Sequence, residues 1–422
     1  MPPRYTCGVD YYAIWPSGAC LAALLLLARG PLFAANDAAN DLPPTPQPRR
    51  LATLDGLRGF LALAVVLYHG AIYHLYLAAG RWEAPPGTYY LLLGQTGVSL
   101  FFMITGYLFW SQVLRARGRP AWARLYVGRV FRIAPLYLVA ILAMLALVGM
   151  HTGWRLRVPV PDLLRQAGTW LLLGAMDPRD VNGQPATLLL LAGVTWTLRY
   201  EWLFYLSLPV LAVAARRRRL ALPLTIALAA AAVYWAHLGA PWFLSPSDPG
   251  SAALFSLGML SAALHGQGWH ARMSGTLASC AVAGLALLLY RGYPLYWGYL
   301  PAFPQATLAL WALCFHLIAS GCTVFGLLTS RAARRLGAAS YGIYLLQGPV
   351  LACVFYPAAV RRFALASPLH HWAALLAALV ALVLVATLAH AWVERPGIAL
   401  GRRVAALWLP ARRGRVEAPP VA

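Results

Sequence analysis

The chain has 422 residues, of which 61% are hydrophobic and 11% are charged. Soluble domains carry about 25% charged residues, so this composition excludes an ordinary soluble protein. The formal net charge is +22, but the arginines fall between apolar runs and do not gather on one basic face. That distribution argues against a nucleic-acid partner and follows the positive-inside rule of membrane proteins.

Residues 1–50 differ in character from the rest of the chain. Their apolar stretch, 19–28, is too short to cross a bilayer, and proline and asparagine dominate from 31 to 48. We expect this segment to be a disordered or interfacial N-terminal extension.

Apolar runs separated by arginine clusters fill the chain from residue 51 to residue 393. The expected spans are 51–77, 89–113, 129–150, 192–215, 220–238, 252–265, 274–290, 304–328, 336–356 and 372–393. If both termini are cytoplasmic, nearly every arginine cluster lies inside. The predicted fold class is therefore all-α, a polytopic membrane helix bundle with about ten transmembrane helices and cytoplasmic N and C termini. A membrane domain over 51–396 and a cytoplasmic basic tail over 397–422 complete the domain prediction.

The first span, LDGLRGFLALAVVLYH, carries two ionisable residues at a shared helical face. Arg58 and His69 are eleven residues apart in the sequence, about 16 Å along a helix. An imidazole at membrane depth is costly and suits general-base chemistry, although a hydrogen-bonded core histidine is the alternative. Arg58 suits an anionic donor group, and its alternative is a snorkelling anchor.

Four further charged residues qualify as site candidates. Arg129 and Arg132 share a helix face and suit the phosphates of a nucleotide-like donor, or simply anchor the helix. Glu201 lies well inside a predicted span, where it either orients His69 or belongs to a structural ion pair. Glu394, before the helix-breaking Pro396, either pairs with Arg58 or Arg132 or caps its own helix.

Six segments together resemble the acyltransferase 3 family of bacterial membrane O-acyltransferases, which act on O-antigens, Nod factors and macrolides. These are LDGLRGFLALAVVLYH, GVSLFFMITGYLF, GRVFRIAPLYL, TWTLRYEWLFYLSLP, GAASYGIYLLQGPV and VERP, in family order. Gln347 stands where the family often has histidine, so no catalytic role is assigned to it. The first fifty residues have no counterpart in the pattern.

The resemblance implies transfer of an acyl group, commonly acetyl from acetyl-CoA, to a hydroxyl of a carbohydrate or glycosylated acceptor. By this resemblance His69 matches the catalytic histidine, Arg58 its partner, and Arg129 with Arg132 a second arginine pair. The implied setting is the inner membrane, with acyl-CoA, a saccharide acceptor and the lipid bilayer as partners. No bound cofactor and no metal are expected.

A transporter or flippase for a lipid-linked or acylated glycan is the rival interpretation. In that case His69 and Glu201 would form a proton relay. Transporters commonly contain internal repeats, and the sequence has no convincing repeat.

Overall fold

The computed structural model describes residues 11–36, 49–176, 178–238, 247–271, 273–297 and 305–408. Within these ranges all regular structure is helical apart from one isolated bridge between Val181 and Gln184. The predicted all-α class is confirmed.

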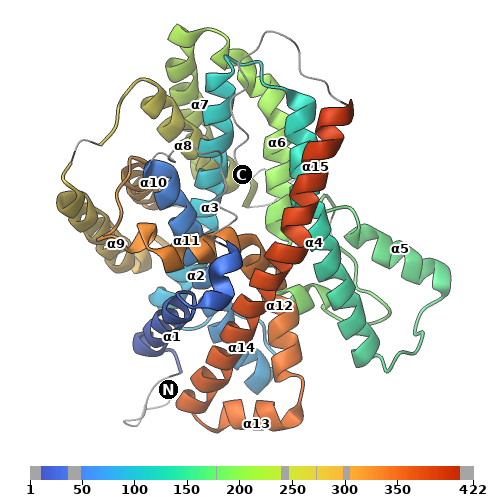
Figure 1. Ribbon diagram of the computed structural model, residues 1–422. Helices are drawn as coiled ribbons and strands as arrows, with labels where there is room; N and C mark the ends of the chain where they lie inside the picture. Colours follow the sequence, from blue (N-terminus) through green and yellow to red (C-terminus); the bar gives the residue numbers. More distant parts are fainter. Residues whose placement is uncertain are drawn as a thin grey trace.

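The helices follow one another along the chain with short connections (Figure 1). The α-helices are α1 (Ile14–Leu27), α2 (Arg49–Ala79), α3 (Thr88–Arg115), α4 (Trp122–His151), α5 (Val160–Trp170), α6 (Trp196–Ala215), α7 (Arg218–Leu238), α8 (Ser247–Gly266), α9 (Gly275–Trp297), α10 (Gln305–Ala319), α11 (Arg331–Ala338), α12 (Ser340–Phe355), α13 (Ala358–Ala366), α14 (Pro368–Ala389) and α15 (Arg395–Trp408). Shorter turns are η1 (Pro31–Asn36), η3 (Thr187–Leu191), η4 (Leu327–Thr329) and the π-helical η5 (His390–Glu394).

Six helices of the described ranges are long and apolar enough to cross a membrane. They are Ala52–Ala79, Thr88–Arg115, Trp122–His151, Arg219–Leu238, Gly275–Gly292 and Pro368–Trp408. The pair α11 and α12, bent by 66°, gives a seventh if counted as one span. These helices indicate a membrane protein, but the predicted count of about ten spans is not confirmed. One reason is that α10 ends at Ala319, before Gly321 adopts a positive φ of 105°.

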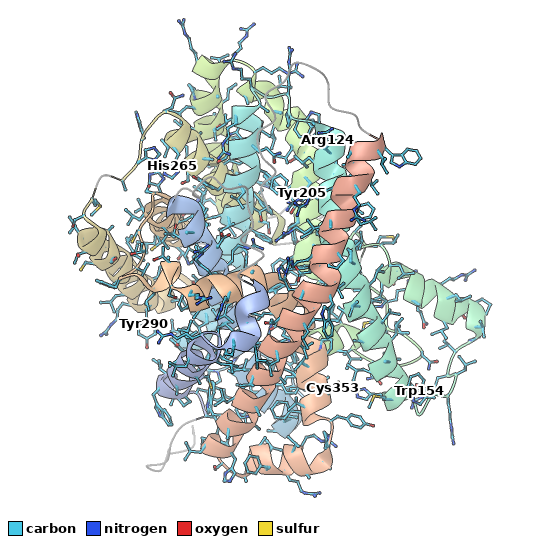
Figure 2. The ribbon with its side chains drawn as sticks, in the orientation of Figure 1. Arg124, Trp154, Tyr205, His265, Tyr290 and Cys353 are labelled. Carbon is cyan, nitrogen blue, oxygen red and sulfur yellow. The ribbon has the colours of Figure 1, made fainter. Side chains whose placement is uncertain are left out.

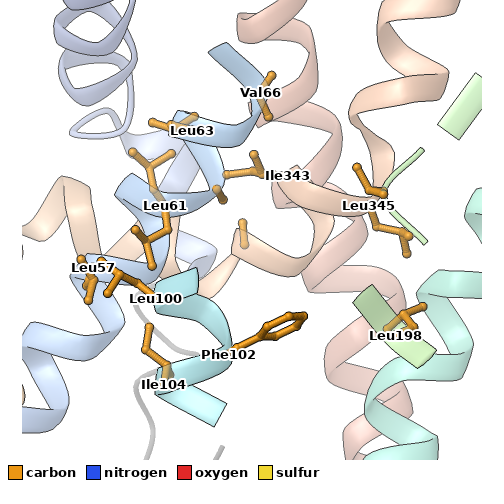
Figure 3. Packing of buried hydrophobic residues seen from close by; sticks show 14 of the residues in the cluster. Leu57, Leu61, Leu63, Val66, Leu100, Phe102, Ile104, Leu198, Ile343 and Leu345 are labelled. Atoms are coloured by element: carbon orange, nitrogen blue, oxygen red, sulfur yellow. The ribbon is translucent and has the colours of Figure 1, made fainter. Parts of the chain in front are cut away.

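The core of the bundle is built around α2. This helix packs against α3, α11 and α12, and α3 packs in turn along α8. Figure 3 shows Leu57 and Leu61 of α2, Phe102 of α3 and Ile343 of α12 within this packing. Removing such side chains from water or lipid into dense contact stabilises the bundle through many small dispersion terms.

Two glycines allow α3 and α8 to touch at backbone distance. A Cβ atom at Gly106 would lie 2.2 Å from the carbonyl oxygen of Phe255. A Cβ atom at Gly258 would lie 2.1 Å from the carbonyl oxygen of Met103. Small residues at such crossings are typical of membrane helix interfaces. Gly106 and Gly258 thus serve the packing of α3 against α8.

Residues 11–36 of the expected N-terminal extension contain the helix α1 and the turn η1. Helix α1 packs against α14, and Cys20, Leu24 and Ala28 are buried in the core. Residues 1–10 and 37–48 of the predicted extension lie outside the described residues.

The C-terminal membrane segment also differs from expectation, because Pro396 does not end it. Helix α14, the π-helical turn η5 and α15 form one continuous stretch of 41 residues. Pro396 lies directly after the π-helical turn, and the helical stretch continues past it to Trp408.

Candidate active site

His69 lies in the middle of α2, buried against the neighbouring helix α12. Its Nδ1 atom is 2.8 Å from Oε1 of Gln347. The Nε2 atom of Gln347 donates in turn to the carbonyl oxygen of Tyr344, at 2.6 Å. The side-chain amide of Gln347 is therefore fixed with its oxygen toward the imidazole.

This arrangement defines the tautomer of His69. An amide oxygen only accepts hydrogen bonds, so Nδ1 of His69 must carry the proton and donate it. The lone pair of the neutral ring is then on Nε2. A histidine held in this way is oriented as a proton acceptor at Nε2.

His69 lines a cavity of about 320 Å³ between α2, α3, α6 and α8. Aromatic side chains make up much of the wall, and an amide and two hydroxyl side chains interrupt it. The aromatic lining residues are Tyr68, Trp82, Phe102, Trp196 and Tyr344, and the polar ones are Gln95, Ser99 and Ser251. The rings of Tyr68 and Trp82 lie 5.2 and 5.8 Å from the imidazole, centroid to centroid. A mostly apolar cavity with a few polar groups is typical of a small-molecule site.

The position of Gln347 depends on a close helix approach one residue later. A Cβ atom at Gly348 would lie 2.3 Å from the backbone carbon of Leu191 and 2.4 Å from the nitrogen of Ala192. The 66° bend between α11 and α12 directs α12 toward this contact. Glycine at 348 is therefore what allows Gln347 to reach His69.

A second polar cluster surrounds Arg58, about 16 Å along α2 from His69. Arg58 interacts electrostatically with Arg132, Asp55, Glu394 and Arg129. Glu201 interacts with the same three arginines, and Asp55 adds Arg334. The cluster thus holds four arginines and three carboxylates, so it carries an excess of positive charge when all are ionised. We call these seven residues the arginine cluster.

Glu201 and Arg129 both interact with Tyr205 of α6, which is labelled in Figure 2. The hydroxyl of Tyr205 donates to Oε2 of Glu201 at 2.7 Å. The guanidinium of Arg129 lies 5.0 Å above the ring of Phe109, a cation–π contact. The observed hydrogen-bond partner of Glu201 is thus Tyr205, and that of His69 is Gln347, so Glu201 does not orient His69 through a direct hydrogen bond.

Glu394 reaches the arginine cluster from the π-helical turn η5. Its carboxylate is completely buried, and Oε2 lies 3.3 Å from Nδ1 of His390. The other oxygen, Oε1, and the Nε2 atom of His390 have no hydrogen-bond partner within the described chain. Single π-helical turns are rare and occur often at functional sites. Glu394 also interacts electrostatically with Arg58.

All six candidates therefore fall into two groups, with His69 at the cavity and Arg58, Arg129, Arg132, Glu201 and Glu394 in the arginine cluster. The sequence did not identify Gln347 as the partner of His69, nor Asp55 and Arg334 as members of the arginine cluster. Asp55 precedes Arg58 by three residues, a helical spacing that places both on one face. Within the described ranges no group of three or more histidine, cysteine or acidic side chains is arranged to hold a metal ion.

The described residues thus form a helical membrane bundle with a buried imidazole at a cavity and a separate arginine cluster. The chain is a member of the acyltransferase 3 family, because the family model described as an acyltransferase domain matches residues 51–391. Helix α1 lies outside the matched residues.

A curated relative supports this assignment. Nodulation protein 10 of Rhizobium leguminosarum bv. viciae is 31% identical over 191 residues, covering 42% of this chain and 48% of the relative. The chain thus spans about half the length of the curated relative that it matches. No solved structure matches the chain.

Proposed function

We propose that this acyltransferase moves an acyl group, acetyl in the simplest case, from acyl-CoA to a hydroxyl of a carbohydrate or glycosylated acceptor. The observation that carries the proposal is the hydrogen bond from Nδ1 of His69 to Gln347, beside a cavity. It leaves Nε2 of a neutral imidazole as the proton acceptor, which is what a general base requires.

In the proposed reaction His69 acts on the acceptor hydroxyl. Nε2 takes the hydroxyl proton while the oxygen attacks the carbonyl carbon of the thioester. The tetrahedral intermediate then collapses, the carbon–sulfur bond breaks, and CoA leaves as a thiol after receiving the proton from the imidazolium. The new ester and free CoA account for every atom, and no bound cofactor is needed.

The arginine cluster is the proposed site for the phosphates of the donor. Guanidinium groups stay charged and bind phosphate through paired N–H donors. The separation of about 16 Å between Arg58 and His69 suits a donor whose phosphates stay at one end while its thioester reaches the imidazole. Asp55, Glu201 and Glu394 would hold the arginines in position in the absence of the donor.

The acceptor is proposed to bind in the cavity beside His69. The rings of Trp82, Trp196 and Tyr344 offer flat apolar faces, and Ser99 and Ser251 offer hydroxyl partners. Such a combination suits the alternating apolar and polar faces of a sugar. The family resemblance supports the same class of acceptor.

We propose a multi-pass protein of the inner membrane with about ten crossings in the family domain. The N-terminal end of α2 and the C-terminal end of α15 would face the cytoplasm. The arginine groups at 115–119 and 216–219 support this orientation through the positive-inside rule. The donor site would then open toward cytoplasmic acyl-CoA.

The deciding experiment incubates membranes containing the protein with radiolabelled acetyl-CoA and candidate saccharide acceptors. We expect alkali-labile label on the acceptor with the wild-type protein and none with His69→Ala. Unchanged transfer by the variant would overturn the role of His69. Movement of unmodified glycan across vesicles without esterification would favour the transporter alternative.

A further inference from the structure

The N-terminal segment contacts the two opposite ends of the buried part of α2. At one end, Tyr11 stacks on His74 with ring centroids 3.7 Å apart, and the Tyr12 hydroxyl lies 3.1 Å from Nδ1 of His74. At the other end, Arg335 of α11 contacts the carbonyls after α1. Helix α11 packs there against the Arg58 end of α2, since a Cβ atom at Gly59 would lie 2.7 Å from the carbonyl oxygen of Ala333.

The contact at Arg335 holds the turn that follows α1. Its Nη1 atom donates to the carbonyl oxygens of Ala28 and Arg29 at 2.9 Å and of Gly30 at 3.0 Å. A buried guanidinium thus connects the carbonyls of this turn to α11. Arg335 is 1% exposed, so this is an internal connection and not the surface anchor that a basic cluster suggests.

Helix α1 itself has 14 residues, about 21 Å, and the distance covered by the whole segment 11–36 follows from its contacts with α2 and α14. From Arg58 to His74 is 16 residues, about 24 Å along α2. The segment 11–36 also runs beside most of α14. At the start of α14, Trp372 Nε1 donates to the carbonyl oxygen of Tyr11, and after its end η5 contacts η1. Trp372 and His390 are 18 residues apart in a membrane-span candidate, about 27 Å. This is close to the hydrocarbon thickness of about 30 Å.

The surface of α1 and its flanking charges agree with a membrane setting. Leu24 and Ala28 are buried, whereas Trp15 and Leu26 are exposed. Arg29 follows the apolar stretch on the side where α2 begins with Arg49. Tyrosine and tryptophan residues gather at the other end, as they do at membrane interfaces.

We propose that residues 11–36 form an additional membrane crossing, outside the family domain, that runs antiparallel to α2. Tyr11 then lies on the non-cytoplasmic side of the membrane, opposite Arg49. The crossing covers the side of the bundle formed by α14 and connects the outer end of α2, five residues beyond His69, to α11. This proposal replaces the cytoplasmic N terminus predicted from the sequence, and it does not depend on the reaction proposed above.

The test places one epitope before Met1 and, in a second full-length protein, the same epitope between residues 40 and 41. Both proteins are expressed in a Gram-negative host, and protease is added to intact spheroplasts and to lysed cells. We expect loss of the N-terminal epitope in intact spheroplasts, and loss of the 40–41 epitope only after lysis. A third protein with the epitope after Arg217 is the cytoplasmic reference and should resist protease until lysis.

Protection of both N-terminal epitopes until lysis would overturn the proposal, because it puts both ends of α1 in the cytoplasm. Loss of both in intact spheroplasts would overturn it as well. Detergent size-exclusion profiles that match the untagged protein identify tagged proteins that retain the fold.

Discussion

The Nδ1 atom of His69 and the Oε1 atom of Gln347 lie 2.8 Å apart, although 278 positions separate the two residues in the chain. The first helix of the family domain and the helix after the bend at α11 thus share one hydrogen bond at the cavity. This bond gives His69 its tautomer, and the chemistry proposed for the protein depends on it.

Replacing His69 by alanine is expected to lower kcat by about 10²- to 10⁴-fold, the usual contribution of a general base. Release of CoA from acetyl-CoA in the presence of acceptor measures the rate. His370→Ala is the matched control, because His370 lies exposed at the start of α14. A His69→Ala protein as active as His370→Ala would contradict the proposed role.

Gln347→Leu removes the acceptor for the Nδ1 proton and lets the imidazole change tautomer and turn. We expect kcat to fall by about 10-fold or more, while KM for the donor stays near its original value, as for loss of a partner that orients a histidine. Gln347→Glu retains an acceptor oxygen and should recover much of the lost rate. A rise in donor KM with unchanged kcat would instead assign Gln347 to substrate binding.

Arg58→Ala or Arg132→Ala should weaken the preference for a donor that carries phosphates. The value of kcat/KM for acetyl-CoA is expected to fall about 10- to 100-fold, because a hydrogen bond to a charged group contributes about 1.5–3 kcal/mol. The value for S-acetylpantetheine, which lacks the phosphates, should change little. The exposed Arg217 supplies the control variant Arg217→Ala. Equal losses with both donors would argue against phosphate binding by these arginines.

Gly348→Val should separate α12 from η3, because the new side chain meets the backbone of Leu191 and Ala192. The cost of overpacking is about 1–3 kcal/mol, and Gln347 shifts together with the helix. We expect a lower Tm in detergent and a reduced rate. Gly284→Val, at a site with open space around it, should leave both measurements unchanged. A normal Tm for Gly348→Val would show that this approach is not tight.

The sequence is informative where a single helix carries the signal. Arg58 and His69 lie on one continuous helix, so their separation along it follows from spacing alone. The glycine at 106 also gives a local signal for close packing. Membrane helices are predictable for a similar reason, since a run of apolar side chains is a property of one segment.

Contacts between distant segments are not readable from one sequence. The partner of His69 lies on α12, and only the bend after α11 and the absence of a side chain at 348 bring it there. Arg335 illustrates the same limit, because its basic neighbourhood suggests a surface anchor while its guanidinium is buried against α1. Among the described residues, α10 is a short helix and α11 and α12 are bent relative to each other by 66°, and neither feature is evident from a run of apolar residues.

The π-helical turn η5 has a consequence for the register of everything that follows it. A π-helical turn holds one residue more than an α-helical turn, which rotates the residues after it by about 100° relative to an uninterrupted α-helix. Gly397 and Gly401 meet α4 only in this rotated frame, where Cβ atoms would lie 2.7 Å from Pro135 and 2.6 Å from Phe131. The single extra residue in η5 thus places Gly397 and Gly401 on the side of α15 that lies against α4.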